Sequence, residues 1–176
     1  MKKIGLVMLL VLLVSAMALV CACSCDSGGK DVQLKYDNGK LSGARGIGGP
    51  GWGSVVAFSP TSVPYTINKV HVCGKLVGSG EGLTFDIVIW DKEQKELYNS
   101  SFASTLFSAS PGWVDIKVPM VVVNNNFYVV VIPNASKDNG VYIGYDTSAN
   151  NGHSAVVKNW QSQPTEVNWM IRVSGS

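Results

Sequence analysis

Apolar side chains alternate with polar ones along several short segments after residue 31. Phe85–Ile89 and Val114–Val118 both place an apolar residue at every second position. This two-residue period predicts β-strands with one buried face. Phe127–Ile132 is apolar on both faces, which predicts a central strand that is covered on both sides. No window after residue 31 repeats apolar residues at helical spacing, so the expected fold class is all-β.

Turn-forming residues separate the expected strands. Asp91–Lys95 predicts a charged hairpin loop, and Asn124–Asn126 supplies residues that tolerate positive φ. Roughly ten short strands in about 145 residues predict a two-sheet antiparallel β-sandwich that is jelly-roll-like, with a β-barrel as the alternative. The expected strands are Gln33–Tyr36, Gly53–Ser59, Tyr65–Cys73, Leu83–Asp91, Glu96–Phe102, Trp113–Val118, Phe127–Pro133, Val141–Asp146, Ala155–Trp160 and Val167–Val173.

The N-terminus follows a different pattern. Met1–Lys3 is a short positive start and Ile4–Val20 is an uncharged run rich in Leu and Val, which is the layout of a signal peptide. Val20-Cys21-Ala22-Cys23 resembles the bacterial lipoprotein box, so Cys23 is the expected lipid-attachment residue, with Cys25 as the second choice. An uncleaved anchor is the alternative, because about 20 apolar residues suffice to span a bilayer. Plain secretion is the third alternative.

These patterns divide the chain into three regions. We expect residues 1–22 to be the signal peptide, residues 23–31 a flexible tether after the lipidated cysteine, and residues 32–176 a single β-sandwich domain. The tether is polar and has nothing to bury. The expected location is that of an exported protein, lipid-anchored to the cell membrane and facing the periplasm or the cell exterior.

Charge and cysteine usage narrow the chemistry. The formal charge of +2 comes from Lys2 and Lys3 in the signal segment. The rest of the chain has no Lys/Arg cluster, which argues against nucleic acid as a partner. Three of the four cysteines lie within five residues at the processing site, so neither a disulfide framework nor a zinc site is expected. Cys73 is expected to be a buried thiol. We expect no cofactor, no metal and a monomeric domain.

A resemblance to a known class of domain covers most of residues 50–173. The motifs that carry it are Phe85–Asp91, Pro111–Val114, Phe127–Val131, Gly144–Asp146 and Gly152–Ser154. In this order they resemble accessory β-sandwich modules of exported bacterial and archaeal proteins. The resemblance implies a jelly-roll-like domain of the kind attached to secreted peptidases, glycosidases or lipoproteins, and such modules are usually non-catalytic.

Residues suited to hydrolysis are sparse. His71 faces opposite to the apolar residues of its strand, so a solvent-facing or sheet-edge position is expected. A catalytic interpretation of the other histidine makes Asp146 orient His153 and Ser154 act as nucleophile. Adjacent His and Ser rarely have the geometry for proton transfer, and no G-x-S-x-G motif is present. The favoured interpretation is that Asp146 and Ser154 hydrogen-bond the loop backbone. No enzyme is therefore expected, and a calcium site in this loop is a weaker alternative.

Aromatic residues at strand ends are the remaining functional indication. Trp52, Trp113 and Trp160 each lie where a strand meets a loop, and Asn159 and Gln161 flank the last of them. Flat rings can stack on the faces of sugars while neighbouring amides bind the hydroxyl groups. These five residues are the candidate ligand-binding set. The alternative is that each ring seals an end of the hydrophobic core.

Two functions are compatible with these features. The first is a non-catalytic cell-envelope lipoprotein whose β-sandwich is a binding module for a glycan or cell-wall polymer. The second is an interaction subunit that docks on another envelope protein and takes no small ligand. A hydrolase is a distant third. An exposed aromatic cleft would favour the first function, and a flat apolar patch would favour the second.

Overall fold

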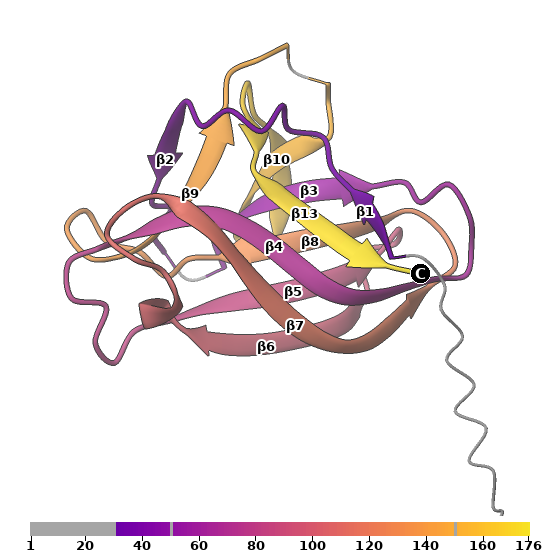
Figure 1. Ribbon diagram of the computed structural model, residues 1–176, viewed down its shortest axis with the longest axis horizontal. Helices are drawn as coiled ribbons and strands as arrows, with labels where there is room; N and C mark the ends of the chain where they lie inside the picture. The colour runs from indigo at the N-terminus through magenta and orange to yellow at the C-terminus, as the bar shows by residue number, and fades with distance from the viewer. Residues whose placement is uncertain (1–30, 50, 150) are drawn as a thin grey trace, which may run out of the picture.

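The computed structural model describes residues 31–49, 51–149 and 151–176. The predicted signal peptide 1–22, Cys23 and the tether up to residue 30 lie outside these ranges. Thirteen strands and one short 3₁₀-helix follow one another along the described chain (Figure 1). Their bounds are β1 Val32–Leu34, β2 Gly43–Arg45, β3 Gly53–Phe58, β4 Tyr65–Val77, β5 Thr84–Asp91, β6 Glu96–Ala103, η1 Ser104–Leu106, β7 Gly112–Val123, β8 Phe127–Ile132, β9 Gly140–Asp146, β10 Ser154–Lys158, β11 Gln161–Pro164, β12 Asn168–Trp169 and β13 Ile171–Gly175.

The strands form two separate antiparallel sheets, which confirms the predicted β-sandwich over the barrel alternative. The first, here called the β4 sheet, has the order β1-β13-β4-β9-β12, with β7 also paired to β4 and β2 to β9. The second, the β8 sheet, has the order β11-β10-β3-β8-β5-β6. Asp91–Lys95 connects β5 to its antiparallel neighbour β6, as the hairpin prediction required.

Strand β8 is buried on both faces. It lies between β3 and β5 in the middle of its sheet. Val129 and Val131 belong to the main core between the sheets, whereas Val130 and Ile132 belong to a second apolar cluster on the opposite face. Trp90 of β5 is part of this second cluster. The prediction of a central, doubly covered strand from the unbroken apolar run is therefore confirmed.

Strand β4 joins most of the other sheet. Its first part pairs with β13 and β7, and Gly74–Val77 then pairs with β9. The sequence predicted an end at Cys73, but the strand continues because Gly74 lets β9 come close. A Cβ at Gly74 would lie 2.8 Å from the Tyr142 carbonyl oxygen, closer than atoms of a side chain can approach. A glycine inside a strand here marks close backbone contact rather than an end.

Two strands were not expected from the sequence. Gly43–Arg45 forms β2 by pairing with β9, although the sequence pattern predicts a loop there. Gln161–Pro164 forms β11 by pairing with β10, and all four of its residues are exposed. Neither segment carries alternating apolar residues, so the sequence gives no strand signal there. Both strands are defined by backbone pairing and not by burial of side chains. The expected strand at 167–173 is divided into β12 and β13 at Met170, which is buried.

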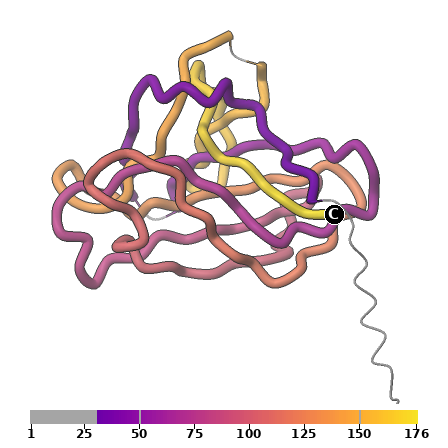
Figure 2. The backbone as a smooth tube through the Cα atoms, in the orientation of Figure 1, coloured from indigo at the N-terminus to yellow at the C-terminus, as the bar shows by residue number. Residues whose placement is uncertain are grey.

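The first described residues and the C-terminus lie side by side (Figure 2), because Val32 of β1 pairs with Gly175 of β13. In the part of the chain that the structure describes, no helix has the length and apolarity needed to cross a bilayer.

Candidate functional site

An aromatic cleft lies between the two sheets. Its volume is about 480 Å³, which is within the range of small-molecule sites. Residues of β2, β9 and β12 from the β4 sheet line it together with a residue of β10 from the β8 sheet, so its shape depends on how the two sheets pack. The lining residues of this aromatic cleft are Ala44, Arg45, Gly46, Ile47, Gly48, Trp52, Tyr142, Val156 and Trp169.

One wall of the aromatic cleft is the short segment Gly46–Gly48. It follows β2 outside any strand, so its peptide groups are not engaged in the sheet ladders. The backbone at Gly46 packs against the ring of Tyr142, and a Cβ there would lie 2.7 Å from a ring carbon. The Tyr142 hydroxyl is 2.6 Å from the carbonyl oxygen of Lys137, and this hydrogen bond fixes the ring. The wall is therefore a ring held by its hydrogen bond, with backbone that belongs to no strand beside it.

Trp52 and Trp169 supply the other aromatic surfaces. Trp169 is 1% exposed and forms the floor, where its Nε1–H donates to the carbonyl of Ala155 at 2.8 Å. This bond connects β12 to β10 and hence one sheet to the other. Trp52 is half-buried, and Gly49 lies against its ring, since a Cβ there would be 3.2 Å from the indole. Of the five predicted binding residues, Trp52 is the one that lines this cleft.

Two cationic side chains flank the aromatic cleft. The Lys158 ammonium lies 4.4 Å from the centroid of the Trp52 ring. The Arg45 guanidinium carbon lies 4.6 Å from the centroid of Tyr145. Distances of this size are typical of cation–π contacts, so the aromatic rings hold both cations in place.

Trp160 lies outside the aromatic cleft and borders a second hollow. That hollow has a volume of about 330 Å³ and is also lined by Trp90, Gln94 and Glu96. The rings of Trp160 and Trp90 are 6.0 Å apart between centroids, and Trp160 is still 54% exposed. Asn159 and Gln161 lie on the same β10–β11 hairpin and are exposed. Trp160, Asn159 and Gln161 therefore lie together, as predicted, but at a separate site next to the aromatic cleft.

The β10–β11 turn holds its tryptophan in a rare backbone conformation. Asn159 has φ of 50° and Trp160 has φ of 62°. A two-residue hairpin turn of this kind favours Asn followed by Gly, and a bulky side chain at positive φ is costly. Strain kept at an exposed aromatic residue is consistent with a role for the ring at the surface.

Trp113 is separated from both sites. It lies on β7, is 40% exposed and has the Arg172 guanidinium carbon 4.1 Å from its ring centroid. Its strand pairs with β4, whereas the cleft lies along β2, β9 and β10. The predicted five residues thus occupy three places. Sequence reasoning missed Tyr142 and Trp169 as cleft residues, because an aromatic residue within a strand gives no signal that it reaches a cleft.

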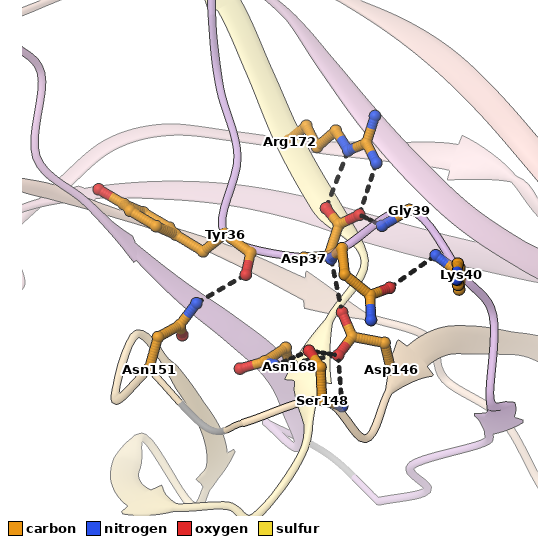
Figure 3. Close-up of polar contacts among 10 residues, drawn as sticks. Tyr36, Asp37, Gly39, Lys40, Asp146, Ser148, Asn151, Asn168 and Arg172 are labelled. Carbon is orange, nitrogen blue, oxygen red and sulfur yellow. Dashed lines mark hydrogen bonds and ion pairs between the residues drawn. The ribbon is translucent and has the colours of Figure 1, made fainter.

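Asp146 forms the centre of a polar network next to the β4 sheet (Figure 3). It is fully buried, and its oxygens accept hydrogen bonds from the Asn38 N–H at 2.9 Å, the Asn168 amide at 3.0 Å, and the Ser148 N–H and hydroxyl. Burial would raise the pKa of Asp146, but the hydrogen bonds outweigh burial and hold the pKa below its usual value. The expected backbone-bonding role of this residue is confirmed.

His153 takes no part in that network. Its ring stacks on Tyr36 with centroids 3.5 Å apart, and Nδ1 lies 3.1 Å from the carbonyl oxygen of Ala57. The Ser154 hydroxyl accepts the backbone N–H of Trp169 at 3.0 Å. The arrangement in which Asp146 orients His153 toward Ser154 does not form, because each group is bound elsewhere.

A second Asp–His–Ser row crosses three strands of the β4 sheet. His71 Nδ1 lies 2.6 Å from an Asp115 carboxylate oxygen, and Nε2 lies 2.8 Å from the Ser174 hydroxyl. The sequence placed His71 on the outward face correctly, but its side chain is only 12% exposed, so it is not solvent-facing. Catalysis would need an accessible hydroxyl and oxyanion donors beside it. Ser174 is 8% exposed on paired strands, so the row acts as a cross-strand network.

Cys73 is a buried free thiol, as expected. Burial, followed by the nearby Asp37 carboxylate, raises its pKa, which is the opposite of what a nucleophilic cysteine needs. Among the described residues, no group of three or more His, Cys, Asp or Glu side chains could hold a metal ion.

Comparison with known proteins gives structural matches only. No protein-family model matches the sequence, and no curated protein matches it either. The fold is similar to that of the clostridial cysteine protease Cwp84 after propeptide cleavage, with a TM-score of 0.60, 12% identity, and coverage of 82% of this chain and 40% of that chain.

A second similar structure contains the cysteine protease and lectin-like domains of Cwp84, a surface-layer-associated protein of Clostridium difficile. Its TM-score is 0.51 at 12% identity, and the match covers 70% of this chain and 32% of that chain. This chain therefore spans less than half the length of either matched chain. At such low identity the similarity establishes the fold alone.

Proposed function

We propose that this chain is a non-catalytic, lectin-like module that binds a saccharide in the aromatic cleft. The observation that carries the proposal is the cleft itself, where Trp52, Tyr142 and Trp169 meet the backbone of Gly46–Gly48, which belongs to no strand. Aromatic rings match the apolar faces of sugars, and peptide groups match their hydroxyls. A few placed polar groups in a mostly apolar cleft are typical of small-ligand sites.

The chemistry of Cys73 supports a lectin-like rather than a protease relationship to the matched proteins. A cysteine protease uses an accessible thiol with a lowered pKa. Cys73 is the only cysteine in the described ranges, and it is buried with a raised pKa. The lectin-like domain of Cwp84 is therefore the better analogue, and we infer the same kind of place for this chain, exported and at the cell surface. Lipid attachment at Cys23 remains part of the proposal.

A glycan array probed with the full chain in detergent tests the proposal. Trp52→Ala removes one wall of the cleft and is expected to abolish binding, with a loss of roughly 1–3 kcal/mol per stacked ring by analogy with other aromatic stacking. Trp113→Ala is the matched control, because Trp113 lies away from the cleft. Retention of every bound glycan by the Trp52→Ala variant would contradict the proposal.

Docking on another envelope protein is the second candidate. Exposed apolar side chains on β6 and β7 favour it: Leu97 is 40% exposed, Met120 81% and Val122 52%. If these residues form a partner surface, Met120→Lys should disrupt the complex and leave glycan binding intact. An unmodified chain that binds no glycan would make this second function the better proposal.

A further inference from the structure

The charged side chains at the aromatic cleft are all positive. None of the nine lining residues is acidic. Arg45 is one of them, and Lys158 lies over the ring of another, Trp52. Both cationic side chains are exposed. The cleft therefore presents two cations to a ligand in an otherwise aromatic and peptide-lined surface.

Neither cation is neutralised by the described part of the chain. The ion pairs there join Lys69 and His71 to Asp115, Lys92 to Glu93, and Arg172 to Asp37. Arg45 and Lys158 instead rest on aromatic rings. A cation–π contact orients a cation without removing its charge, so both remain able to bind an anion.

Their geometry suits a ligand that spans the cleft. Arg45 comes from β2 of the β4 sheet, and Lys158 is the last residue of β10 in the β8 sheet. The guanidinium offers planar, paired donors for a carboxylate or phosphate, while the ammonium acts as a compact point charge. A sugar ring between the aromatic walls would bring an acidic substituent within the field of both groups.

We propose that the ligand of the aromatic cleft is an acidic saccharide, in which a carboxylate or phosphate group pairs with Arg45 and Lys158. This inference rests on the proposed saccharide function and names the class of sugar. It also differs from what sequence alone predicts, because the two basic residues are far apart along the chain and form no visible cluster.

Paired oligosaccharides test the inference. The full chain in detergent is titrated with uronic acid oligosaccharides, with the methyl esters of the same oligosaccharides, and with oligosaccharides that carry a phosphate group in place of the carboxylate. The acids should bind about tenfold more tightly than their esters, a ratio typical of one charge-assisted contact. Raising the salt from about 0.05 M to about 0.5 M should remove most of this preference, because exposed charges are screened. Binding of the uronic acids identifies a carboxylate ligand, and binding of the phosphorylated oligosaccharides identifies a phosphate ligand.

Charge-removing variants assign the effect to the two cations. Lys158→Gln and Arg45→Gln should each lower the affinity ratio of acid to ester from about tenfold to about threefold, because the two cations share the preference. Both residues are exposed, so the fold should be unchanged. Lys117→Gln is the matched control, because Lys117 is an exposed residue of β7, away from the cleft.

The outcomes separate this inference from the function on which it rests. Equal binding of acids and esters, unaffected by Lys158→Gln and Arg45→Gln, would overturn the acidic preference and leave saccharide binding intact. Failure of every acidic and neutral oligosaccharide to bind would overturn the saccharide function and the inference together. Loss of acid binding in the Lys117→Gln control would show that general surface charge, and not this pair, carries the preference.

Discussion

Arg172 of β13 binds Asp37 through two parallel hydrogen bonds, Nε to Oδ2 at 2.8 Å and Nη2 to Oδ1 at 2.5 Å (Figure 3). The Asp37 side chain is 0% exposed and that of Arg172 is 15% exposed. The hydrogen bonds to Asp37 raise the pKa of Arg172. The pair fixes the segment after β1 to the outer face of the last strand.

Removal of this acid should destabilise the domain strongly. Asp37→Ala leaves a mostly buried guanidinium without its partner, and we expect the free energy of unfolding to fall by about 2–4 kcal/mol. Urea denaturation measures this fall in the free energy of unfolding. Glu93→Gln is the control, because the exposed Lys92–Glu93 pair should contribute less than about 0.5 kcal/mol. Equal effects of the two substitutions would show that the Arg172–Asp37 pair has no special structural role.

Asp146 should make the domain sensitive to acid. Its folded-state pKa is lowered, so its charged form is stabilised by folding. Its contribution is complete above the unfolded pKa, about 3.9, and is lost as the pH falls through the lower, folded value. The free energy of unfolding, measured by denaturation between about pH 6 and pH 2, should therefore decline below about pH 4. This decline should be shallower in the Asp146→Asn variant.

Asp115 is the comparison for that experiment. Its pKa is also lowered, first by the hydrogen bond from His71, but its side chain is 56% exposed. Solvent screens exposed pairs, so Asp115→Asn should change the acid limb less than Asp146→Asn does. A larger effect of Asp115→Asn than of Asp146→Asn would show that the main acid-sensitive contact is the one between Asp115 and His71.

Trp160 should affect long ligands only. Gly49 lies against Trp52 of the aromatic cleft and Gly51 lies against Trp160 of the second hollow, so the two sites are neighbours. An oligosaccharide that extends beyond the aromatic cleft toward Gly51 would reach the Trp160 ring. We expect Trp160→Ala to weaken binding of longer oligosaccharides by roughly 1 kcal/mol or more per stacked ring and to leave a disaccharide unaffected. Calorimetry over a series of chain lengths would detect the difference, and an equal loss at every length would contradict it.

Gly46 should be required for the shape of the aromatic cleft. Gly46→Ala places a methyl group 2.7 Å from the Tyr142 ring, which must shift to accommodate it. Overpacking of this kind typically costs about 1–3 kcal/mol, and the displaced ring should weaken ligand binding. Gly112→Ala is the control, because a Cβ there has nothing within 4 Å. Thermal melting and ligand titration of both variants check the prediction, and an unchanged Gly46→Ala variant would show that Tyr142 is free to move.

Cys23 is expected to be the lipidated N-terminus of the mature chain. The charged start, the apolar run and the small residue before the cysteine carry this prediction. Mass spectrometry of protein extracted from membranes should find a chain that begins at Cys23 with an attached lipid. A chain that retains Met1 would favour the uncleaved anchor instead.

The sequence by itself determined the elements whose signal is local. The two-residue apolar period predicted most strands, and the unbroken run Phe127–Ile132 predicted a strand covered on both faces, because side-chain burial follows directly from alternation along one strand. The Asp91–Lys95 hairpin was predicted for the same reason, since a turn and its flanking strands are contiguous. Trp52 was identified as a candidate because it lies where a strand meets a loop.

Only the tertiary structure decided which residues meet. Arg45 and Lys158 reach one cleft because β2 and β10 lie at the same opening of the sandwich, and His71, Asp115 and Ser174 meet because β4 lies between β7 and β13. Sheet order and register determine such neighbours, and neither is encoded in local periodicity. β2 and β11 were missed for a related reason: their backbones pair with other strands, while their side chains carry no apolar pattern.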